Sequence, residues 1–174
     1  MWPPRRPTRV PSFREVGHEF FATAPVSETL RQSLPISAAG AFRCLEDADA
    51  WPVWLEPVDR VTWTTSPPFG VGTTRDIHIR TGTVAETFYD WDDGHRMSFH
   101  FSRGAIPGLR AFAEDYELLP TGADTCELVW RYAFEFGGIG RMIQPLFAFG
   151  FGRAARRSVH NLAAFLTDDA ERYA

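Results

Sequence analysis

Residues 34–54 read LPISAAGAFRCLEDADAWPVW, and this stretch decides the fold. It joins a strand that ends at Pro35, where proline cannot donate to a sheet ladder, to two short helices. Ser37 stands at the N-cap position of the first helix. Asp49 is placed to cap the second helix, which begins near Trp51. The order strand, helix, helix is therefore predicted for the first part of the chain.

Outward from this stretch, segments that alternate polar and apolar residues predict further strands, separated by glycine-containing turns as in an antiparallel meander. Seven strands are expected in all, over residues 28–35, 58–65, 73–80, 83–91, 96–103, 109–119 and 125–136. From Ile139 to Leu166 the apolar residues recur at helical spacing, which predicts one long C-terminal helix. Pro145, Gly150 and Gly152 interrupt this pattern, so we expect the helix to start late, to kink, or to approach another backbone closely at these positions.

The predicted fold class is α+β: a helix-grip fold in which a seven-stranded curved antiparallel sheet, two short helices and a long C-terminal helix enclose a cavity. The cavity is expected to measure a few hundred cubic ångströms, near the ~300–1,000 Å³ usual for ligand sites. Residues 1–12 contain four prolines and three arginines and are predicted to form a disordered tail. Residues 13–174 are predicted to form a single domain, with residues 13–25 along its surface or at a sheet edge.

The amino-acid composition argues against several classes of function. All 18 basic residues are arginine and the formal net charge is −4, so we expect no broad cationic face and no nucleic-acid partner. Cys44 and Cys126 are too few for a disulfide framework or a zinc site, and the histidines, interpreted as solvated surface residues, form no metal-binding pair. We therefore expect no cofactor and no metal. No apolar run approaches ~18 residues, which predicts a cytoplasmic protein without a membrane span; its oligomeric state stays open.

Strand alternation predicts which side chains face the cavity. Arg75 shares its side of the strand with Ile77, and Glu86 shares its side with Phe88. Glu114 falls on the inward side in the same way, so one cation and two carboxylates should lie among aromatic rings. The predicted ligand-binding residues are Arg75, Met97, Phe99, Phe101, Phe112, Tyr116, Trp130, Tyr132 and Phe147.

Two interpretations of the charged residues remain open. In one, Arg75, Glu86 and Glu114 form a buried ion-pair network that serves stability alone, since removing one partner of such a pair costs ~3–5 kcal/mol. In the other, they are catalytic. Arg75 then donates hydrogen bonds to a ligand carbonyl, enolate or carboxylate, and a carboxyl group whose pKa is raised by desolvation acts as general acid or base.

Several short motifs are recognisable together: residues 34–38 (LPISA), 47–54 (DADAWPVW), 69–75 (FGVGTTR), 86–88 (ETF) with Trp91 behind them, 96–99 (RMSF) and 112–116 (FAEDY). As a set they resemble the START-like superfamily, also called SRPBCC, in its branch of polyketide cyclase/dehydrase and lipid transport proteins. The resemblance covers about residues 14–170 and implies the helix-grip fold. It also implies that Arg75 acts with tyrosine and tryptophan neighbours, as the interior arginine of the aromatase/cyclases does, the corresponding types being Tyr116, Tyr132 and Trp130.

Three functions are compatible with these features. The leading hypothesis is binding of a small hydrophobic molecule, polyketide-, lipid- or isoprenoid-like, in the cavity. The second is cyclisation or dehydration of a poly-β-keto substrate in the same cavity, with Arg75 as oxyanion donor and Glu86 or Glu114 as proton shuttle. The third is a protein-interaction module. Whether the protein is an enzyme is left open by the sequence.

Overall fold

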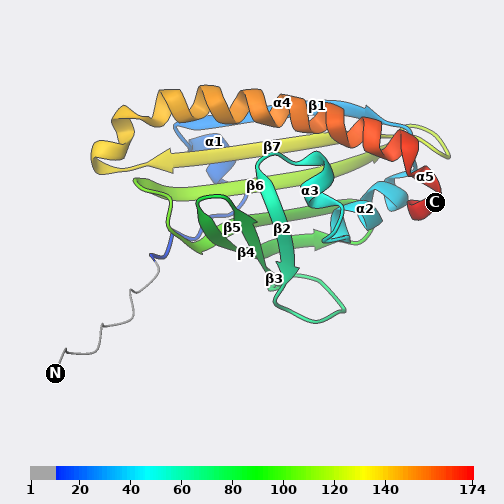
Figure 1. Ribbon diagram of the computed structural model, residues 1–174, viewed down its shortest axis with the longest axis horizontal. Coiled ribbons are helices and arrows are strands. Elements are labelled where there is room, and N and C mark those ends of the chain that lie inside the picture. The colour runs from blue at the N-terminus through cyan, green and yellow to red at the C-terminus, as the bar shows by residue number, and fades with distance from the viewer. Residues whose placement is uncertain (1–10) are drawn as a thin grey trace.

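The structure is a computed structural model that describes residues 11–174 (Figure 1). Seven antiparallel strands form one sheet in the order β1-β7-β6-β5-β4-β3-β2. The strands are β1 (Val26–Leu34), β2 (Val58–Trp63), β3 (Thr74–Ile79), β4 (Gly82–Asp92), β5 (Arg96–Gly104), β6 (Leu109–Pro120) and β7 (Cys126–Phe136). The helices are α1 (Phe20–Thr23), α2 (Ala38–Glu46), α3 (Trp51–Trp54), the 3-10 helix η1 (Gly138–Met142), α4 (Gln144–Asp168) and α5 (Ala170–Tyr173).

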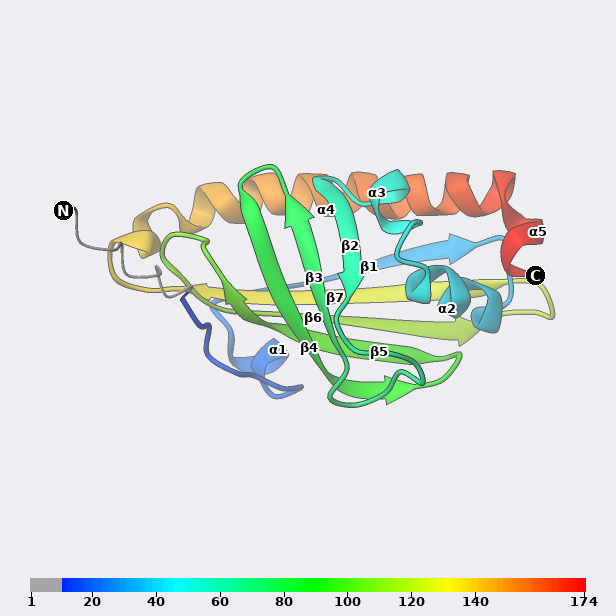
Figure 2. The ribbon, with the colours of Figure 1, turned by 60° about the horizontal axis from the view of Figure 1, so that its bottom comes forward.

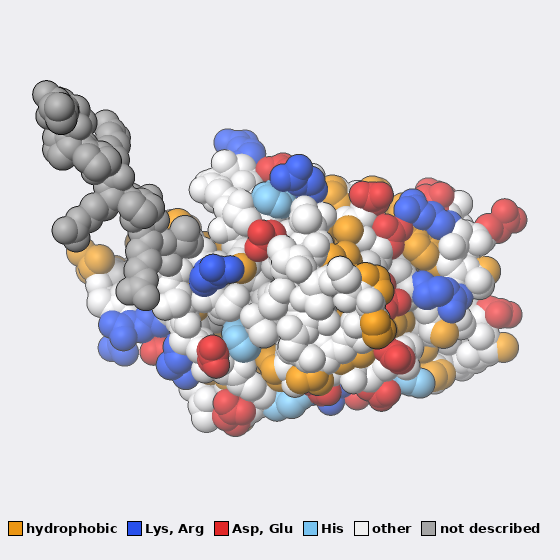
Figure 3. Space-filling model, turned by 90° about the horizontal axis from the view of Figure 1, so that it is seen from below, with side chains coloured by type: hydrophobic (Ala, Val, Ile, Leu, Met, Phe, Trp, Pro, Cys, Tyr) orange, Lys and Arg blue, Asp and Glu red, His pale blue; other side chains and the backbone are white. Residues whose placement is uncertain are grey.

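The sheet curves around α4. Strands β1, β6 and β7 run along the helix, whereas β2, β3 and β4 turn towards it, so that helix and sheet enclose a common interior (Figure 2). The side turned away from α4 carries arginine and acidic side chains interspersed (Figure 3). The predicted fold class and the seven strands are confirmed, although β1 begins two residues before the predicted strand, at Val26.

The two short helices are anchored as the sequence suggests, with one exception. Ser37 Oγ accepts a hydrogen bond from the backbone N–H of Gly40 at 3.1 Å, which confirms the predicted N-cap of α2. The predicted cap of α3 by Asp49 is wrong, because the N-cap residue is Ala50 and no side chain caps this helix. Instead, the backbone N–H of Asp49 donates to Asp47 Oδ1 at 3.0 Å, in a turn that leads from α2 to α3.

The long helix begins late, as Pro145 suggests. The chain first forms η1, and α4 then starts at Gln144 with Pro145 in its first turn, where the missing N–H costs nothing. Gln144 Oε1 accepts a hydrogen bond from the backbone N–H of Phe136 at 2.9 Å, which fixes the start of α4 to the end of β7. The helix then continues to Asp168 without a break.

The N-terminal segment lies against the sheet. Residues 1–10 lie outside the described residues, and so does most of the predicted tail. Its last two residues are paired with β5: Pro11 accepts a hydrogen bond from the N–H of Gly104 at 3.0 Å, and Ser12 forms a bridge with Arg103. The pairing continues with Phe13, whose N–H donates to the carbonyl of Ser102 at 3.1 Å.

Beyond this pairing the segment covers the outer face of the sheet. Val16 and Phe20 pack on a patch of small side chains formed by Ala111, Ala113 and Ala133. His100 lies under the same segment and is buried, with its ring stacked on Tyr89. The interpretation of His100 as a solvated surface residue is therefore wrong, because strand alternation predicts the outer face but not that another segment covers it.

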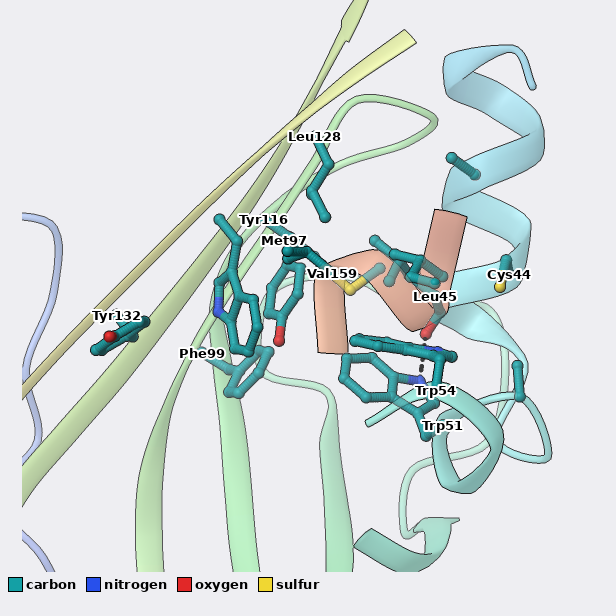
Figure 4. Close-up of a cluster of buried hydrophobic side chains, with 14 of the residues drawn as sticks. Cys44, Leu45, Trp51, Trp54, Met97, Phe99, Tyr116, Leu128, Tyr132 and Val159 are labelled. Carbon is teal, nitrogen blue, oxygen red and sulfur yellow. Dashed lines mark hydrogen bonds between the residues drawn. The ribbon is translucent and has the colours of Figure 1, made fainter. Parts of the chain in front are cut away.

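One end of the interior is solidly packed. Trp51 and Trp54 of α3 meet Tyr116, Phe99 and Met97 of the sheet, and all five side chains are buried (Figure 4). Trp51 Nε1 donates to the carbonyl of Leu45 at 2.9 Å, so α3 is fixed to the end of α2. The open space therefore lies towards the other end, beside the first half of α4.

Candidate functional site

A cavity of about 220 Å³ lies between the inner face of the sheet and α4. Its volume agrees with the expected few hundred cubic ångströms, and β5, β6 and β7 each contribute an aromatic ring, from Phe101, Phe112 and Trp130. Phe147 and Phe151 of α4 close the opposite side. The walls are mainly apolar, which favours an apolar occupant.

The structure brings seven of the predicted site residues to this cavity. They are Arg75, Glu86, Glu114, Phe101, Phe112, Trp130 and Phe147. Four others, Met97, Phe99, Tyr116 and Tyr132, are buried but do not line it. The first three face inward as predicted but lie in the packed cluster beside Trp51 and Trp54 of α3 (Figure 4). The hydroxyl of Tyr132 donates to Glu28 Oε2 of β1 at 2.7 Å.

Arg75 and Glu86 form the polar centre of the cavity wall. They are directly opposite each other on β3 and β4, and Arg75 Nε donates to Glu86 Oε2 at 2.6 Å. The guanidinium carbon lies 4.0 Å from the ring centroid of Trp51 and 4.6 Å from that of Phe99. Stacking on aromatic faces suits the planar, weakly hydrated guanidinium and fixes its orientation.

Glu114 stands apart from this ion pair. It is buried, and its Oε2 accepts a hydrogen bond from the Tyr116 hydroxyl at 2.7 Å. Burial, followed by the nearby charge of Glu86, raises the pKa of Glu114 to about 8. A pKa near 8 favours the protonated form of the Glu114 carboxyl group at neutral pH. Burial also raises the pKa of Glu86, but its ion pair with Arg75 opposes the rise.

Two hydrogen-bond donors at the cavity wall are left unused. Arg75 Nη1 and Trp130 Nε1 are buried, and neither makes a hydrogen bond of normal geometry within the part of the chain that the structure describes. The Trp130 indole nevertheless lies close enough to the Glu114 carboxyl group to lower its pKa, so Arg75 Nη1 is the more clearly available of the two donors. Both residues line the cavity. Buried donors are usually paired in native proteins, so these two are available to an acceptor that enters the cavity. Trp54 Nε1, which does not line the cavity, is buried without a partner as well.

Sequence reasoning missed the part of the lining that comes from outside the central strands. Residues 55–57, between α3 and β2, form one wall without any periodic signal in the sequence, and Val58 at the start of β2 continues it. Phe151 and Ala154 line the cavity from α4. Their helical spacing from Phe147 could have identified both, because residues at i, i+4 and i+7 share a face.

Within residues 11–174, no group of three or more histidine, cysteine, aspartate or glutamate side chains is arranged to hold a metal ion. None of the helices described there is long and apolar enough to cross a membrane.

The family described as "polyketide cyclase / dehydrase and lipid transport" matches residues 26–167. The chain belongs to this family. The match lies within the START-like (SRPBCC) superfamily and supports a ligand-binding or cyclase role.

The chain is also similar to individual proteins and solved structures. Uncharacterized proteins of Mycobacterium tuberculosis and Mycobacterium bovis are 37% identical over 153 residues, which cover 86% of this chain and 90% of theirs. The Zhui aromatase/cyclase from Streptomyces sp. R1128 superposes with a TM-score of 0.67 at 12% identity, over 83% of this chain and 95% of that one.

A second solved structure is the di-domain aromatase/cyclase BexL, with a TM-score of 0.66 at 14% identity. The alignment covers 80% of this chain but only 45% of BexL, so the chain spans less than half the length of that protein. At such low identity both structures show a shared fold alone.

Proposed function

We propose that this family member binds a small, mainly hydrophobic molecule that carries at least one hydrogen-bond acceptor. The observation that carries the proposal is the pair of unused donors, Arg75 Nη1 and Trp130 Nε1, at the wall of an otherwise apolar cavity. A ligand carbonyl, enolate or phenolate would pair with them, while the ligand's apolar body would contact the rings of Phe101, Phe112 and Phe151.

The volume restricts the size of this ligand. A cavity of about 220 Å³ lies below the ~300–1,000 Å³ usual for drug-sized molecules. A compact molecule of one or two rings, or a short polyketide-, lipid- or isoprenoid-like chain, suits this space. Larger polycyclic ligands would require α4 or the loop over residues 55–57 to move.

Two bicyclic probes of the same shape test this proposal. α-Tetralone has a ketone oxygen, and tetralin lacks it. Binding is followed by quenching of tryptophan fluorescence, since Trp51 and Trp130 line the cavity. We expect α-tetralone to bind roughly tenfold more tightly than tetralin, because the donors gain an acceptor.

The preference for the ketone should disappear in Arg75→Met. It should persist in the control Arg60→Met, which removes an exposed arginine on β2. Equal binding of the two probes to the wild type, or an unchanged preference in Arg75→Met, would contradict the proposal.

A second candidate function is favoured by the protonation of Glu114. In a dehydration of a β-hydroxy ketone, Glu86 would accept the α-proton, and Arg75 would stabilise the resulting enolate oxygen. Glu114 would then give its proton to the departing hydroxyl, which leaves as water. Exchange of protons with solvent would restore both carboxyl groups.

The β-hydroxy ketone formed from acetone and benzaldehyde tests this activity, because its dehydration to benzalacetone is followed by ultraviolet absorbance. We expect the wild type to accelerate the reaction and Glu114→Gln to lose most of the acceleration while it still binds α-tetralone. A wild-type rate equal to the uncatalysed rate would leave ligand binding as the function of the cavity.

A further inference from the structure

Large apolar side chains gather on the surface where α4 begins. Of the eight large hydrophobic side chains that are exposed among the described residues, five fall between residues 139 and 149. We call them the α4 patch: Ile139, Met142, Ile143, Leu146 and Phe149, with exposed fractions between 49% and 86%. Several large apolar side chains exposed within one short segment are typical of an interaction surface.

The segment that carries the α4 patch has charges of one sign, and the acidic side chains that reach α4 come from other elements. From Gly137 to Thr167 the sequence contains no aspartate or glutamate, although it contains four arginines. Arg156 and Arg157 are paired with Glu28 and Glu56. Arg141 and Arg153 form no salt bridge within residues 11–174 and are exposed. This surface thus differs from the side opposite α4, where both signs are interspersed (Figure 3).

Helical spacing places exposed apolar side chains and an exposed arginine on the same face of α4. Leu146, Phe149 and Arg153 stand at i, i+3 and i+7, so an apolar pair leads directly to an arginine along one exposed face. On the other side of the same turns, Phe147 and Phe151 line the cavity. The first turns of α4 are therefore apolar all round, which is not the pattern of a helix with one face in water.

We propose that the α4 patch docks on the surface of an anionic lipid bilayer. The apolar side chains would enter the boundary between head groups and acyl chains, while Arg141 and Arg153 would meet the anionic head groups. The chain carries a net charge of −4. Its overall repulsion from such a bilayer makes the orientation with α4 towards the lipid the favourable one.

Two other occupants fit the charges poorly. A second copy of the chain in a two-fold dimer would bring the arginines of the two patches together without an acidic partner on the patch. The chain's own residues 1–10 contain three arginines and no acidic residue, so they would be repelled by Arg141 and Arg153. An anionic bilayer supplies both the apolar interior and the negative charge.

Docking of this kind would place the cavity beside the lipid. Because opposite faces of the same helical turns form the α4 patch and one cavity wall, a hydrophobic ligand would have only a short path between bilayer and cavity. The proposal goes beyond ligand binding and rests on the surface alone. Vesicle binding and α-tetralone binding can therefore succeed or fail independently.

Flotation of the full-length chain with vesicles tests the proposal. We expect binding to vesicles of phosphatidylcholine and phosphatidylglycerol in equal amounts, little binding to phosphatidylcholine alone, and a decrease with added salt. Leu146→Gln/Phe149→Gln should weaken binding roughly tenfold or more, because apolar area no longer enters the membrane. Arg141→Gln/Arg153→Gln should weaken it by a similar factor.

The matched control is Val53→Gln/Val71→Gln, which changes two exposed apolar side chains elsewhere and should bind like the wild type. Ile139→Gln/Met142→Gln, in η1, repeats the test without altering α4. Absence of wild-type binding to the anionic vesicles would overturn the proposal. Vesicle binding that survives both apolar double substitutions but vanishes when Arg5, Arg6 and Arg9 are changed to glutamine would also overturn it. A dimer that forms through the α4 patch, without vesicle binding, would overturn it as well.

Discussion

Arg75 and Glu86 face each other across β3 and β4, with 2.6 Å between Nε and Oε2, and only part of the guanidinium's donor capacity is used by this pair. This geometry is compatible with both interpretations that the sequence leaves open, a structural ion pair and a ligand-binding arginine. The pair neutralises two buried charges, and it holds Arg75 Nη1 at the cavity wall. Substitution of Arg75 separates a structural role from a ligand-binding role.

Arg75→Met should lower the free energy of unfolding by about 1–2 kcal/mol while the protein stays folded. The loss should be smaller than the ~3–5 kcal/mol of a fully buried broken pair, because Glu86 borders the cavity, where it can take up a proton or contact water. Urea unfolding measures the change, with Arg60→Met as control. A loss above that range with unchanged α-tetralone binding would make Arg75 a purely structural residue.

Glu114→Gln should change how stability depends on pH. The carboxyl group of Glu114 has a pKa of about 8 in the folded chain against an ordinary value of 4.5. Below pH 4.5 the carboxyl group of Glu114 is protonated in both the folded and the unfolded chain. As the pH rises from 4.5 towards 8, only the unfolded chain releases this proton. Its contribution to stability is therefore complete at low pH and is lost through that window, by at most about 1.4 kcal/mol per pH unit.

The measurement is a series of urea unfolding curves between these pH values. The wild type should lose more stability than Glu114→Gln as the pH rises. A residual slope is expected in the variant, since the pKa of Glu86 is raised as well. Identical pH dependence in the two proteins would show that Glu114 is already ionised at neutral pH.

Ala154→Leu should fill the cavity from α4. Ala154 lines the cavity and is only partly buried, so the larger side chain can enter the empty space with little strain. We expect affinity for α-tetralone to fall roughly tenfold or more, with a change in stability below about 1.5 kcal/mol. Ala164→Leu, at an exposed position of the same helix, is the control and should bind normally. Unchanged binding in Ala154→Leu would place the ligand outside the cavity.

Gly140→Ala should destabilise the start of the C-terminal helix. A Cβ atom on Gly140 would lie 2.8 Å from the Cα of Gly108, where η1 and the loop before β6 meet backbone to backbone. We expect a loss of about 1–3 kcal/mol in thermal or urea unfolding. Gly150→Ala, within α4 and with no atom within 4 Å of the new Cβ, should instead stabilise by up to ~1 kcal/mol. Equal effects of the two substitutions would contradict the close approach.

Much of the inner face could be predicted because side chains alternate along strands regardless of what covers them. Arg75, Glu86 and Glu114 were placed inward by this rule, and the bulge next to Glu86 did not reverse it. Alternation shows which face of the sheet a side chain occupies, but not whether its position along the strand is next to the cavity. Met97 and Tyr116 therefore satisfy the rule but lie under α3, away from the cavity.

The remaining differences between the sequence-based predictions and the structure come from contacts between segments that are distant in sequence. Nothing in residues 13–25 specifies that they cover the outer face of the sheet, so the burial of His100 could not be foreseen. Residues 55–57 form part of the cavity wall next to the contact between α3 and α4, and an irregular loop has no pattern that reveals such a position.

The order of the strands has a consequence for how the chain folds. β1 is the first strand in the sequence but pairs with the last one, as in the register of Val26 with Phe134. Closing this loop costs chain entropy before the pairing returns any stability. During synthesis, β1 must therefore remain without its partner until β7 has left the ribosome, and α4 can cover the interior only later still. We expect refolding in the ~ms–s range of proteins dominated by non-local pairing, with the ligand cavity among the last features to form.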